Sequence, residues 1–226
     1  MNISLIKQVP LFKSLQPEDS RRIADLLKDQ YLKRGDVLFR KGDEGQALYM
    51  IIQGKIKISV TSRLGDEVIL AIMSDGDFFG EMALLDGLPR SADAVANEDT
   101  NLLVLRRTEF LSFIMRNETA AMSILFALSH RLRKADDFLA DTCFLNIGSR
   151  LAKKLLELGE THGQQEGDTT QIKLILTQSE LASMVGATRE SINKELRKLR
   201  DKGLVTKQGR MLQIHNLERL KRRVRL

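Results

Sequence analysis

The segment from residue 79 to residue 92, FGEMALLDGLPRSA, combines residue types that can hold a small anion. Gly80 has no Cβ, so a ligand can approach the backbone closely at this position. The following residues suit the start of a short helix, from which the amides of Met82 and Ala83 can point at a negative charge.

Side chains of the same segment add charge and directed hydrogen bonds. Arg90 can pair with a phosphate through charge-assisted bonds, and Ser91 adds a hydroxyl and an amide donor. The carboxylate of Glu81 can accept from a ligand hydroxyl. The alternative is a surface loop held by a structural pair between Arg90 and Glu81.

A second pattern, residues 177–205, predicts two short helices joined by a tight turn. Thr177 and Glu180 form a capping box, in which a hydroxyl and a carboxylate satisfy free amides at a helix start. Gly186 ends this helix because it takes a positive φ without a Cβ clash, and Thr188 can cap the next helix. Two helices joined in this way form a helix-turn-helix. The expected inward-facing residues are Leu181, Met184, Val185, Ile192, Leu196 and Leu199.

The polar residues of this pattern are of types that contact DNA. The second helix of a helix-turn-helix reads base edges with its first residues; arginine suits guanine and glutamate suits cytosine, while hydroxyls position phosphates. Residues 204–214 alternate around Gln208 and Gly209, which predicts a β-hairpin wing. The alternative is a helical hairpin with solvated side chains. The predicted DNA-binding residues are Ser179, Thr188, Arg189, Glu190, Ser191, Asn193, Lys194, Lys207 and Arg210.

Charge supports the DNA-binding interpretation. The net charge is +6, but residues 146–226 hold 17 Lys/Arg against 9 Asp/Glu, a balance of +8, and residues 1–145 hold 19 against 21, a balance of −2. A basic C-terminal third favours contact with nucleic acid, and a solvated basic surface is the alternative on charge alone.

Other elements must position these two segments. Residues 31–106 alternate short apolar stretches with glycine turns, which predicts a β-barrel or roll, and residues 17–27 predict a short amphipathic helix before it. Residues 118–142 contain neither Gly nor Pro and predict a long helix. Residues 146–150 predict a hinge, residues 150–159 another helix, and residues 161–170 a polar loop. Cys143 is expected to be a buried apolar residue near the hinge.

The long helix carries a narrow apolar seam with charges around it. Its residues follow a 4-3-4-3-4 spacing, typical of a two-helix coiled coil, so the seam predicts self-association into a homodimer. A helix lying on its own barrel is the alternative. The seam consists of Ala121, Leu125, Leu128, Leu132, Ala135 and Leu139.

Several classes of protein are excluded or disfavoured. One cysteine cannot form an internal disulfide framework or a multi-cysteine metal site. No apolar run is long enough to span a bilayer and the N-terminus lacks a signal-peptide pattern, so we expect a cytoplasmic protein without membrane contact. No paired catalytic histidines, metal-ligand cluster or Walker-type loop is found, so we expect no enzyme and no cofactor.

These motifs together resemble a known family. Residues 79–92 are similar to the phosphate-binding cassette of cyclic-nucleotide-binding domains, residues 48–57 to their β-roll, and residues 188–194 to a recognition helix. Their order and spacing resemble the catabolite activator / fumarate-nitrate regulator (CRP/FNR) superfamily, and most of all its cyclic-AMP receptor branch. The resemblance covers nearly the whole chain. It implies that Gly80, Met82 and Ala83 approach the ligand, Arg90 and Ser91 hold the cyclic phosphate, and Glu81 accepts the ribose 2′-OH.

One pair of positions departs from the cyclic-AMP pattern. Where that branch has two small hydroxyl or amide residues that contact adenine, this chain has Ala135 and Asp136. Ala135 has no polar group, and the Asp136 carboxylate suits the two donors of guanine better than adenine; Asp136 can equally be a solvated flank of the coiled coil. Cyclic AMP is the expected ligand, and cyclic GMP, a cyclic dinucleotide or ligand-independent action stay open.

The sequence therefore predicts an α+β protein with three parts. Residues 1–117 form a cyclic-nucleotide-binding β-roll, residues 118–145 a dimerisation helix, and residues 146–226 a winged helix-turn-helix. The expected function is allosteric, sequence-specific transcription regulation. The expected partners are a second copy of the chain, a palindromic double-stranded operator and RNA polymerase. The resemblance implies that the polar loop of residues 161–168 lies where relatives contact polymerase; its composition alone indicates only that it is exposed.

Overall fold

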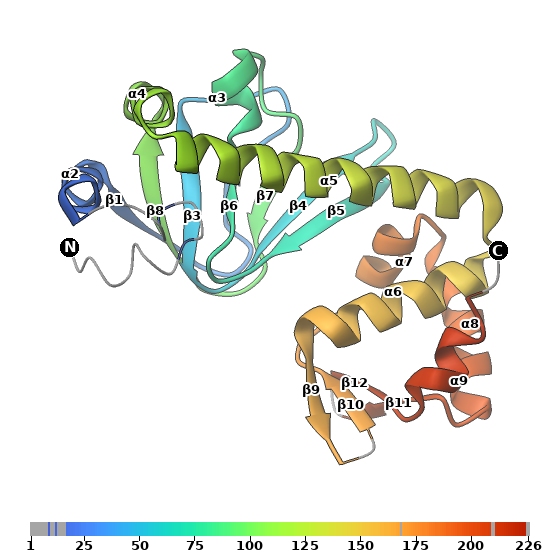
Figure 1. The fold of residues 1–226 in the computed structure, drawn as a ribbon. Helices are drawn as coiled ribbons and strands as arrows, with labels where there is room; N and C mark the ends of the chain where they lie inside the picture. Colours follow the sequence, from blue (N-terminus) through green and yellow to red (C-terminus); the bar gives the residue numbers. More distant parts are fainter. Residues whose placement is uncertain (1–8, 10–11, 13–16, 168, 209–210, 225–226) are drawn as a thin grey trace. The chain divides into compact units, whose positions relative to one another are not determined.

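The computed structural model describes residues 9, 12, 17–167, 169–208 and 211–224. The chain forms two compact units, Met1–Leu132 and Arg133–Leu226. The first unit is built on β-sheets with helices packed against them, and the second is mainly helical with one small sheet (Figure 1). This mixture of a β-roll, a long helix and a helix-turn-helix with a β-wing confirms the predicted fold class.

The first unit contains two four-stranded sheets, of order β1-β8-β3-β6 and β2-β7-β4-β5. Neighbouring strands in both sheets are antiparallel. Strands β2 to β8 all lie within residues 31–106, the range in which the sequence predicts a β-barrel or roll. The strands are β1 (Lys28–Leu32), β2 (Val37–Phe39), β3 (Ala47–Gln53), β4 (Ile56–Thr61), β5 (Glu67–Met73), β6 (Phe78–Phe79), β7 (Asp93–Ala96) and β8 (Thr100–Arg106).

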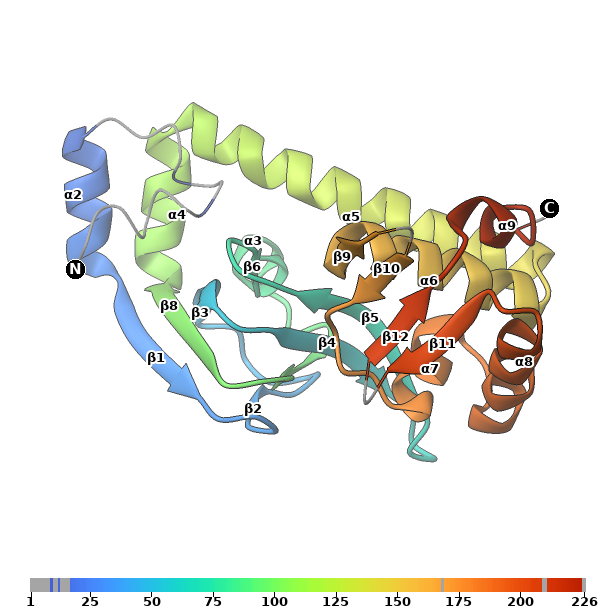
Figure 2. The same cartoon turned by 90° about the horizontal axis from the view of Figure 1, so that it is seen from below.

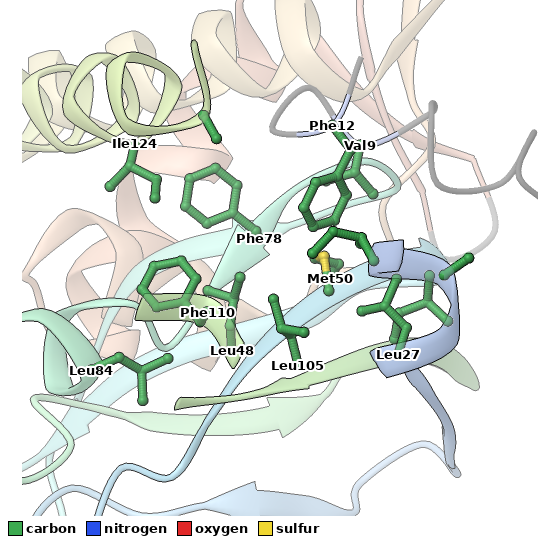
Figure 3. Close-up of a cluster of buried hydrophobic side chains, with 14 residues drawn as sticks. Val9, Phe12, Leu27, Leu48, Met50, Phe78, Leu84, Leu105, Phe110 and Ile124 are labelled. Atoms are coloured by element: carbon green, nitrogen blue, oxygen red, sulfur yellow. The ribbon is translucent and has the colours of Figure 1, made fainter. Parts of the chain in front are cut away.

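Four helices accompany these sheets. They are α2 (Pro17–Leu26), α3 (Met82–Asp86), α4 (Arg107–Arg116) and α5 (Glu118–Phe144). Helices α2 and α4 lie at the same end of the sheets (Figures 1 and 2). One buried cluster joins Leu48, Met50 and Leu105 of the strands to Phe110 of α4 and Ile124 of α5 (Figure 3). This cluster fixes the first part of α5 against the sheet that carries β6, whose end leads into the predicted anion-binding segment.

The exposed face of α5 differs from the predicted seam. Leu128 is only partly exposed because it packs against the buried cluster of its own unit; its predicted place in the dimer seam stays a prediction. Leu125, Leu132 and Leu139 are 56%, 64% and 64% exposed, and Phe126 is 77% exposed. The solvent-facing apolar row therefore keeps the predicted leucines at seven-residue intervals and lies to one side of Leu128.

The second unit packs a helix-turn-helix and a four-stranded antiparallel sheet against α6 (Ile147–His162). The sheet has the order β11-β12-β10-β9, and Figure 2 shows its strands most clearly. No described helix has the length and apolar character needed to cross a membrane. The remaining elements are β9 (Gly163–Glu166), β10 (Thr169–Ile172), α7 (Gln178–Val185), α8 (Arg189–Asp201), β11 (Val205–Gln208), β12 (Met211–Ile214) and α9 (Leu217–Lys221).

Three local predictions in this region are wrong. The predicted polar loop of residues 161–170 is mostly the hairpin β9-β10, because polar side chains pair across its strands: Thr170 Oγ1 donates to Gln165 Oε1 at 3.0 Å. The predicted hinge of residues 146–150 is mostly helix, since the Asn146 side chain accepts from the amide of Ser149 and caps α6. Cys143 is exposed, not buried.

Candidate functional site

The anion-binding segment, residues 79–92, starts at the end of β6 and includes α3. Gly80 follows β6 with a φ of +84°, and a Cβ there would lie 2.6 Å from Arg90 Nη1 and 3.2 Å from the carbonyl oxygen of Ala47. The requirement for glycine thus comes from both the positive φ and the close approach of a guanidinium. Gly87 ends α3 in the left-handed conformation, and the chain then reaches Arg90.

Arg90 lies inside the unit and not on its surface. Only 4% of the residue is exposed. Its Nη1 donates to the carbonyl oxygen of Gly80 at 2.7 Å and its Nη2 to that of Ala47 at 2.8 Å. The guanidinium also lies over the rings of Phe39, at 4.3 Å, and Tyr49, at 5.5 Å.

The Arg90 guanidinium is a buried positive charge. Burial lowers the pKa of Arg90, and the nearby Tyr49, Glu81 and Asp43 act against that shift; a guanidinium stays protonated in proteins even so. Its Nε is buried and has no hydrogen-bond partner within the described part of the chain. A buried donor without a partner costs free energy, so this site favours an added acceptor.

Glu81 is the second buried charge of the segment, with 1% exposure. It does not pair with Arg90, which removes the structural Arg–Glu pair as an explanation for the segment. Instead Glu81 Oε1 accepts from Arg131 Nη1 at 2.5 Å, and Arg131 also donates to the carbonyl oxygen of Phe78. Glu81 Oε2 is buried and has no hydrogen-bond partner among the described residues.

The other predicted ligand residues of the segment differ in exposure. Met82 is 47% exposed, and Ser91 is exposed with its Oγ 3.7 Å from Met82 Sδ. Ala83 is buried against Gly45, where a Cβ would come within 2.3 Å of the Ala83 Cβ. Six predicted ligand residues therefore lie in the one segment between β6 and β7, where Arg90 Nε and Glu81 Oε2 have no hydrogen-bond partner among the described residues.

Ala135 and Asp136, the other two predicted ligand residues, lie on α5. Both are exposed residues of α5 within the second unit, whereas the anion-binding segment belongs to the first. Their predicted contact with a base stays a prediction.

Sequence reasoning missed the residues that surround the two buried charges. Arg131 is one of them: it lies on the long helix, and helix periodicity does not show that it reaches Glu81. Phe39, Tyr49 and Ala47 hold Arg90. They come from strands β2 and β3, whose pairing partners are not encoded in any local pattern.

The helix-turn-helix has the predicted caps and core. Thr177 and Glu180 form the capping box of α7, Gly186 ends α7 with a φ of +65°, and Thr188 accepts from the amide of Ser191 at the start of α8. These local predictions are confirmed. The six residues expected to face inward are all buried, namely Leu181, Met184, Val185, Ile192, Leu196 and Leu199.

The predicted DNA-reading residues lie where the turn presents them. Thr188, Arg189, Glu190, Lys194 and Ser179 are exposed, and Ser191 and Asn193 are partly exposed. In the described part of the chain, no hydrogen bond or ion pair occupies the side chain of Arg189, Glu190, Asn193 or Lys194. The first turns of α8 thus offer donors and acceptors to an outside partner, as a recognition helix does.

The wing is a β-hairpin of β11 and β12, paired from Val205 with Ile214 to Gln208 with Met211. Lys207 is exposed on β11. Arg210, the other basic residue predicted at the tip, lies outside the described residues.

A residue not predicted from sequence supports the turn between α7 and α8. Arg150 of α6 donates from Nη1 to the carbonyl oxygens of Val185, at 3.0 Å, and Gly186, at 3.3 Å. These are carbonyls at the end of a helix, which have no partner within it. Arg150 therefore positions the turn that sets the direction of α8.

Comparison with known proteins places both sites in established domain families. Residues 29–117 match the cyclic nucleotide-binding domain, and residues 149–223 match the Crp-like helix-turn-helix domain. The chain is 33% identical to a CRP-like cAMP-activated global transcriptional regulator of Mycobacterium tuberculosis, over 98% of this chain and 99% of that protein. It is 38% identical to the cyclic AMP receptor protein of Thermus thermophilus, over 88% of this chain and 89% of that one.

A solved structure shares the fold. A CooA variant from Carboxydothermus hydrogenoformans matches with a TM-score of 0.80 and 19% identity, over 96% of this chain and 95% of that chain. Fold and site therefore define a DNA-binding transcription regulator with a cyclic-nucleotide-binding domain. The chain belongs to the CRP/FNR family, whose matched members are transcription regulators and not enzymes.

Proposed function

We propose that this regulator acts as a homodimer whose binding to operator DNA is controlled by cyclic AMP. The proposal that a ligand binds rests on two buried side-chain atoms that have no hydrogen-bond partner among the described residues. These atoms are Arg90 Nε and Glu81 Oε2. The names of the two relatives, cAMP-activated regulator and cyclic AMP receptor protein, support the choice of nucleotide.

The two buried charges suit the two polar ends of a cyclic nucleotide. The Arg90 side chain has five N–H donors. The carbonyl oxygens of Gly80 and Ala47 accept only some of them, so the others can donate to a cyclic phosphate. Ser91, exposed beside Met82, supplies a hydroxyl to the same phosphate. Glu81 can accept the ribose 2′-OH at Oε2 while Oε1 stays with Arg131.

The base is the part of the ligand that the chain specifies least. Ala135 lies four residues after Arg131 on α5, which is about one helical turn. Asp136 is the residue after Ala135. A carboxylate at this position accepts one hydrogen bond from the exocyclic amine of adenine and two from guanine. Cyclic GMP is therefore the second candidate, on the specific ground of Asp136.

The exposed apolar row of α5 supports the homodimer. Leu125, Leu132 and Leu139 recur every seven residues and are more than half exposed, which is the pattern of a two-stranded coiled coil. Two copies of this face form a self-complementary contact about a two-fold axis. We therefore keep residues 118–145 as the proposed dimerisation helix, between a sensor of residues 1–117 and a DNA-binding part of residues 146–226.

A two-fold dimer would read a palindromic operator. Two recognition helices that start at Arg189 suit half-sites about 34 Å apart, one turn of DNA. A regulator of chromosomal DNA works in the cytoplasm of a bacterium, and RNA polymerase is the proposed further partner. The exposed strand β9 with Gly167 after it, residues 163–167, is our candidate for that contact.

Calorimetric titration tests the ligand. We expect cyclic AMP to bind the purified protein and cyclic GMP to bind more weakly. Arg90→Gln should abolish binding, and Arg63→Gln, which changes an exposed arginine on the same unit, should leave it unchanged. Because Arg90 is buried, Ser91→Ala at the exposed end of the segment serves as a milder second variant, expected to weaken binding.

The outcomes separate the candidates. Preferential binding of cyclic GMP would make Asp136 the base-selecting residue and overturn the choice of cyclic AMP. No binding of either nucleotide would favour another ligand or a ligand-independent regulator. Normal binding by a folded Arg90→Gln protein would show that the segment is not the ligand site.

A further inference from the structure

A cavity lies entirely within the second unit. It is lined by the first turn of α6, the later part of α8, and α9 with the two residues after it. Its volume is about 980 Å³, which is at the upper end of the range for small-molecule sites. Neither the cyclic-nucleotide site nor the DNA-reading residues use it.

The lining of this cavity is strongly basic. Six cationic residues face one carboxylate, Glu195, so the formal charge of the lining is +5. Glu195 is itself paired with Lys198 at 2.6 Å. The cationic residues are Arg150, Lys198, Lys202, Arg219, Arg222 and Arg223.

Two of these cations are available to a ligand. In the part of the chain that the structure describes, no hydrogen bond or ion pair occupies the side chains of Lys202 and Arg219, and both residues are exposed. Lys202 follows the last residue of α8 and Arg219 lies on α9, so one ligand bound between them would contact both side chains. Arginine and lysine together are the side chains that bind phosphoryl groups.

The backbone adds to the positive potential. Helix α6 has 16 residues, and its first amides lack intrahelical partners. The Asn146 side chain takes the amide of Ser149. Gly148, in the same first turn, allows α6 to lie close to α8: a Cβ there would come within 2.8 Å of Glu195 Oε2.

The cavity and the DNA-reading residues use different stripes of α8. Glu195, Lys198 and Lys202 recur every three or four residues and share one side of the helix. Arg189 and Asn193 lie on another side of it. Base recognition therefore leaves the cations of the cavity unassigned.

We propose that this cavity is a second ligand site, which binds a small, multiply phosphorylated anion such as a nucleoside polyphosphate. Several phosphoryl groups match a lining of charge +5 spread over α8 and α9, whereas a single phosphate would meet only part of it. Excess positive charge at close range is unfavourable to the folded unit, so a polyanion that fills the cavity also stabilises that unit.

Inorganic tripolyphosphate is the probe, because it offers phosphoryl groups without a base or a ribose. Its binding to the full-length protein is measured by calorimetry at 150 mM salt, where exposed nonspecific attraction is largely screened. The test variant is Lys202→Gln/Arg219→Gln. The charge-matched control is Arg22→Gln/Arg63→Gln, which removes two exposed cations from the first unit.

We expect tripolyphosphate to bind the wild type and the control alike, and to bind the test variant at least about tenfold more weakly. The melting temperature should rise with tripolyphosphate in the wild type and not in the test variant. Absence of binding, or equal binding by the test variant and the control, would overturn the proposal.

Operator DNA is the second arm of the experiment, because its backbone also offers phosphates. If the test variant loses affinity for DNA while the wild type ignores tripolyphosphate, then Lys202 and Arg219 are DNA contacts and the proposal is wrong. If tripolyphosphate binding is lost and DNA binding is kept, the proposal is supported in full. Both results leave the cyclic-nucleotide site untested, so the two proposals fail separately.

Discussion

Replacement of Leu125 by alanine removes three carbon atoms from the exposed row of α5. At about 0.8 kcal/mol per buried carbon, full burial of these atoms would contribute about 2.4 kcal/mol. Because Leu125 is 56% exposed in the single chain, a partner helix can bury about half of that, or about 1.3 kcal/mol. Two symmetric copies give about 2.7 kcal/mol, which corresponds to about a 100-fold weaker dimer.

Sedimentation equilibrium over a series of protein concentrations measures this change directly. The matched control is Leu70→Ala on β5, since Leu70 is 57% exposed but lies outside the row. We expect Leu125→Ala to raise the dimer dissociation constant about 100-fold and Leu70→Ala to leave it unchanged. Equal behaviour of the two variants would refute the assignment of the α5 face to the dimer contact.

Four further predictions each concern a single residue. Arg131→Gln leaves the buried carboxylate of Glu81 without a charged partner and should lower the free energy of unfolding by about 1–3 kcal/mol; urea denaturation followed by tyrosine fluorescence reports it, because both tyrosines lie in the first unit. Gly186→Ala forces a Cβ into the left-handed conformation and should cost the second unit about 1–2 kcal/mol, measured by urea denaturation with circular dichroism. Burial acts to raise the pKa of Glu157, but Lys154 and Lys134 outweigh it and lower that pKa, so Glu157 contributes stability above its unfolded-state pKa. That contribution is lost as pH falls through the lower folded-state pKa; Glu157→Gln should therefore destabilise the protein at pH 7 and not at acid pH in thermal melts. Arg189→Ala should relax sequence choice at one base pair, at a cost of about 1–3 kcal/mol, in binding to a set of single-substitution duplexes.

Each of these has a clear contrary result. Unchanged stability of Arg131→Gln would mean that water replaces the guanidinium. An unchanged melt of Gly186→Ala would mean that the turn relaxes out of the left-handed conformation. A constant deficit of Glu157→Gln from neutral to acid pH would exclude the ion pair as its cause. Equal loss on all DNA sequences would make Arg189 a phosphate contact.

Local chemistry made the helix-turn-helix predictable. The capping box of Thr177 and Glu180, the positive φ of Gly186 and the cap by Thr188 each depend on residues within a few positions of one another. Such interactions are written into the sequence directly. Arg150, which holds the carbonyls of Val185 and Gly186 from α6, could not be predicted in the same way because its partners lie 35 and 36 residues away.

The anion-binding segment also has local features that the sequence predicts and long-range contacts that it does not. Its composition predicted an anion site, and the structure shows why glycine is required at Gly80. The charged side chains of this segment have partners far away in the sequence. Glu81 accepts from Arg131, 50 residues away, and Arg90 donates to the carbonyl oxygen of Ala47, 43 residues away. The hairpin β9-β10 was missed for a related reason, since its strands are paired by polar side chains and carry no apolar alternation.

The sequence predicts the period of the α5 seam, and the structure adds which of the seam residues also pack against the core of their own unit. A 4-3 spacing identifies a helix face without stating which side the protein's own core covers. Leu128 meets that core, and Leu125 and Leu132 do not. Only the packing of α5 against the strands distinguishes these residues.

The most direct test of the account is the effect of cyclic AMP on DNA affinity. A palindromic duplex selected by the protein from a random-sequence pool is labelled, and its fluorescence anisotropy is followed as protein is added with and without cyclic AMP. We predict that cyclic AMP tightens binding by about 5- to 150-fold, and that a folded Arg90→Gln protein gives the same affinity in both conditions. Equal affinity of the wild type with and without the nucleotide would contradict the account.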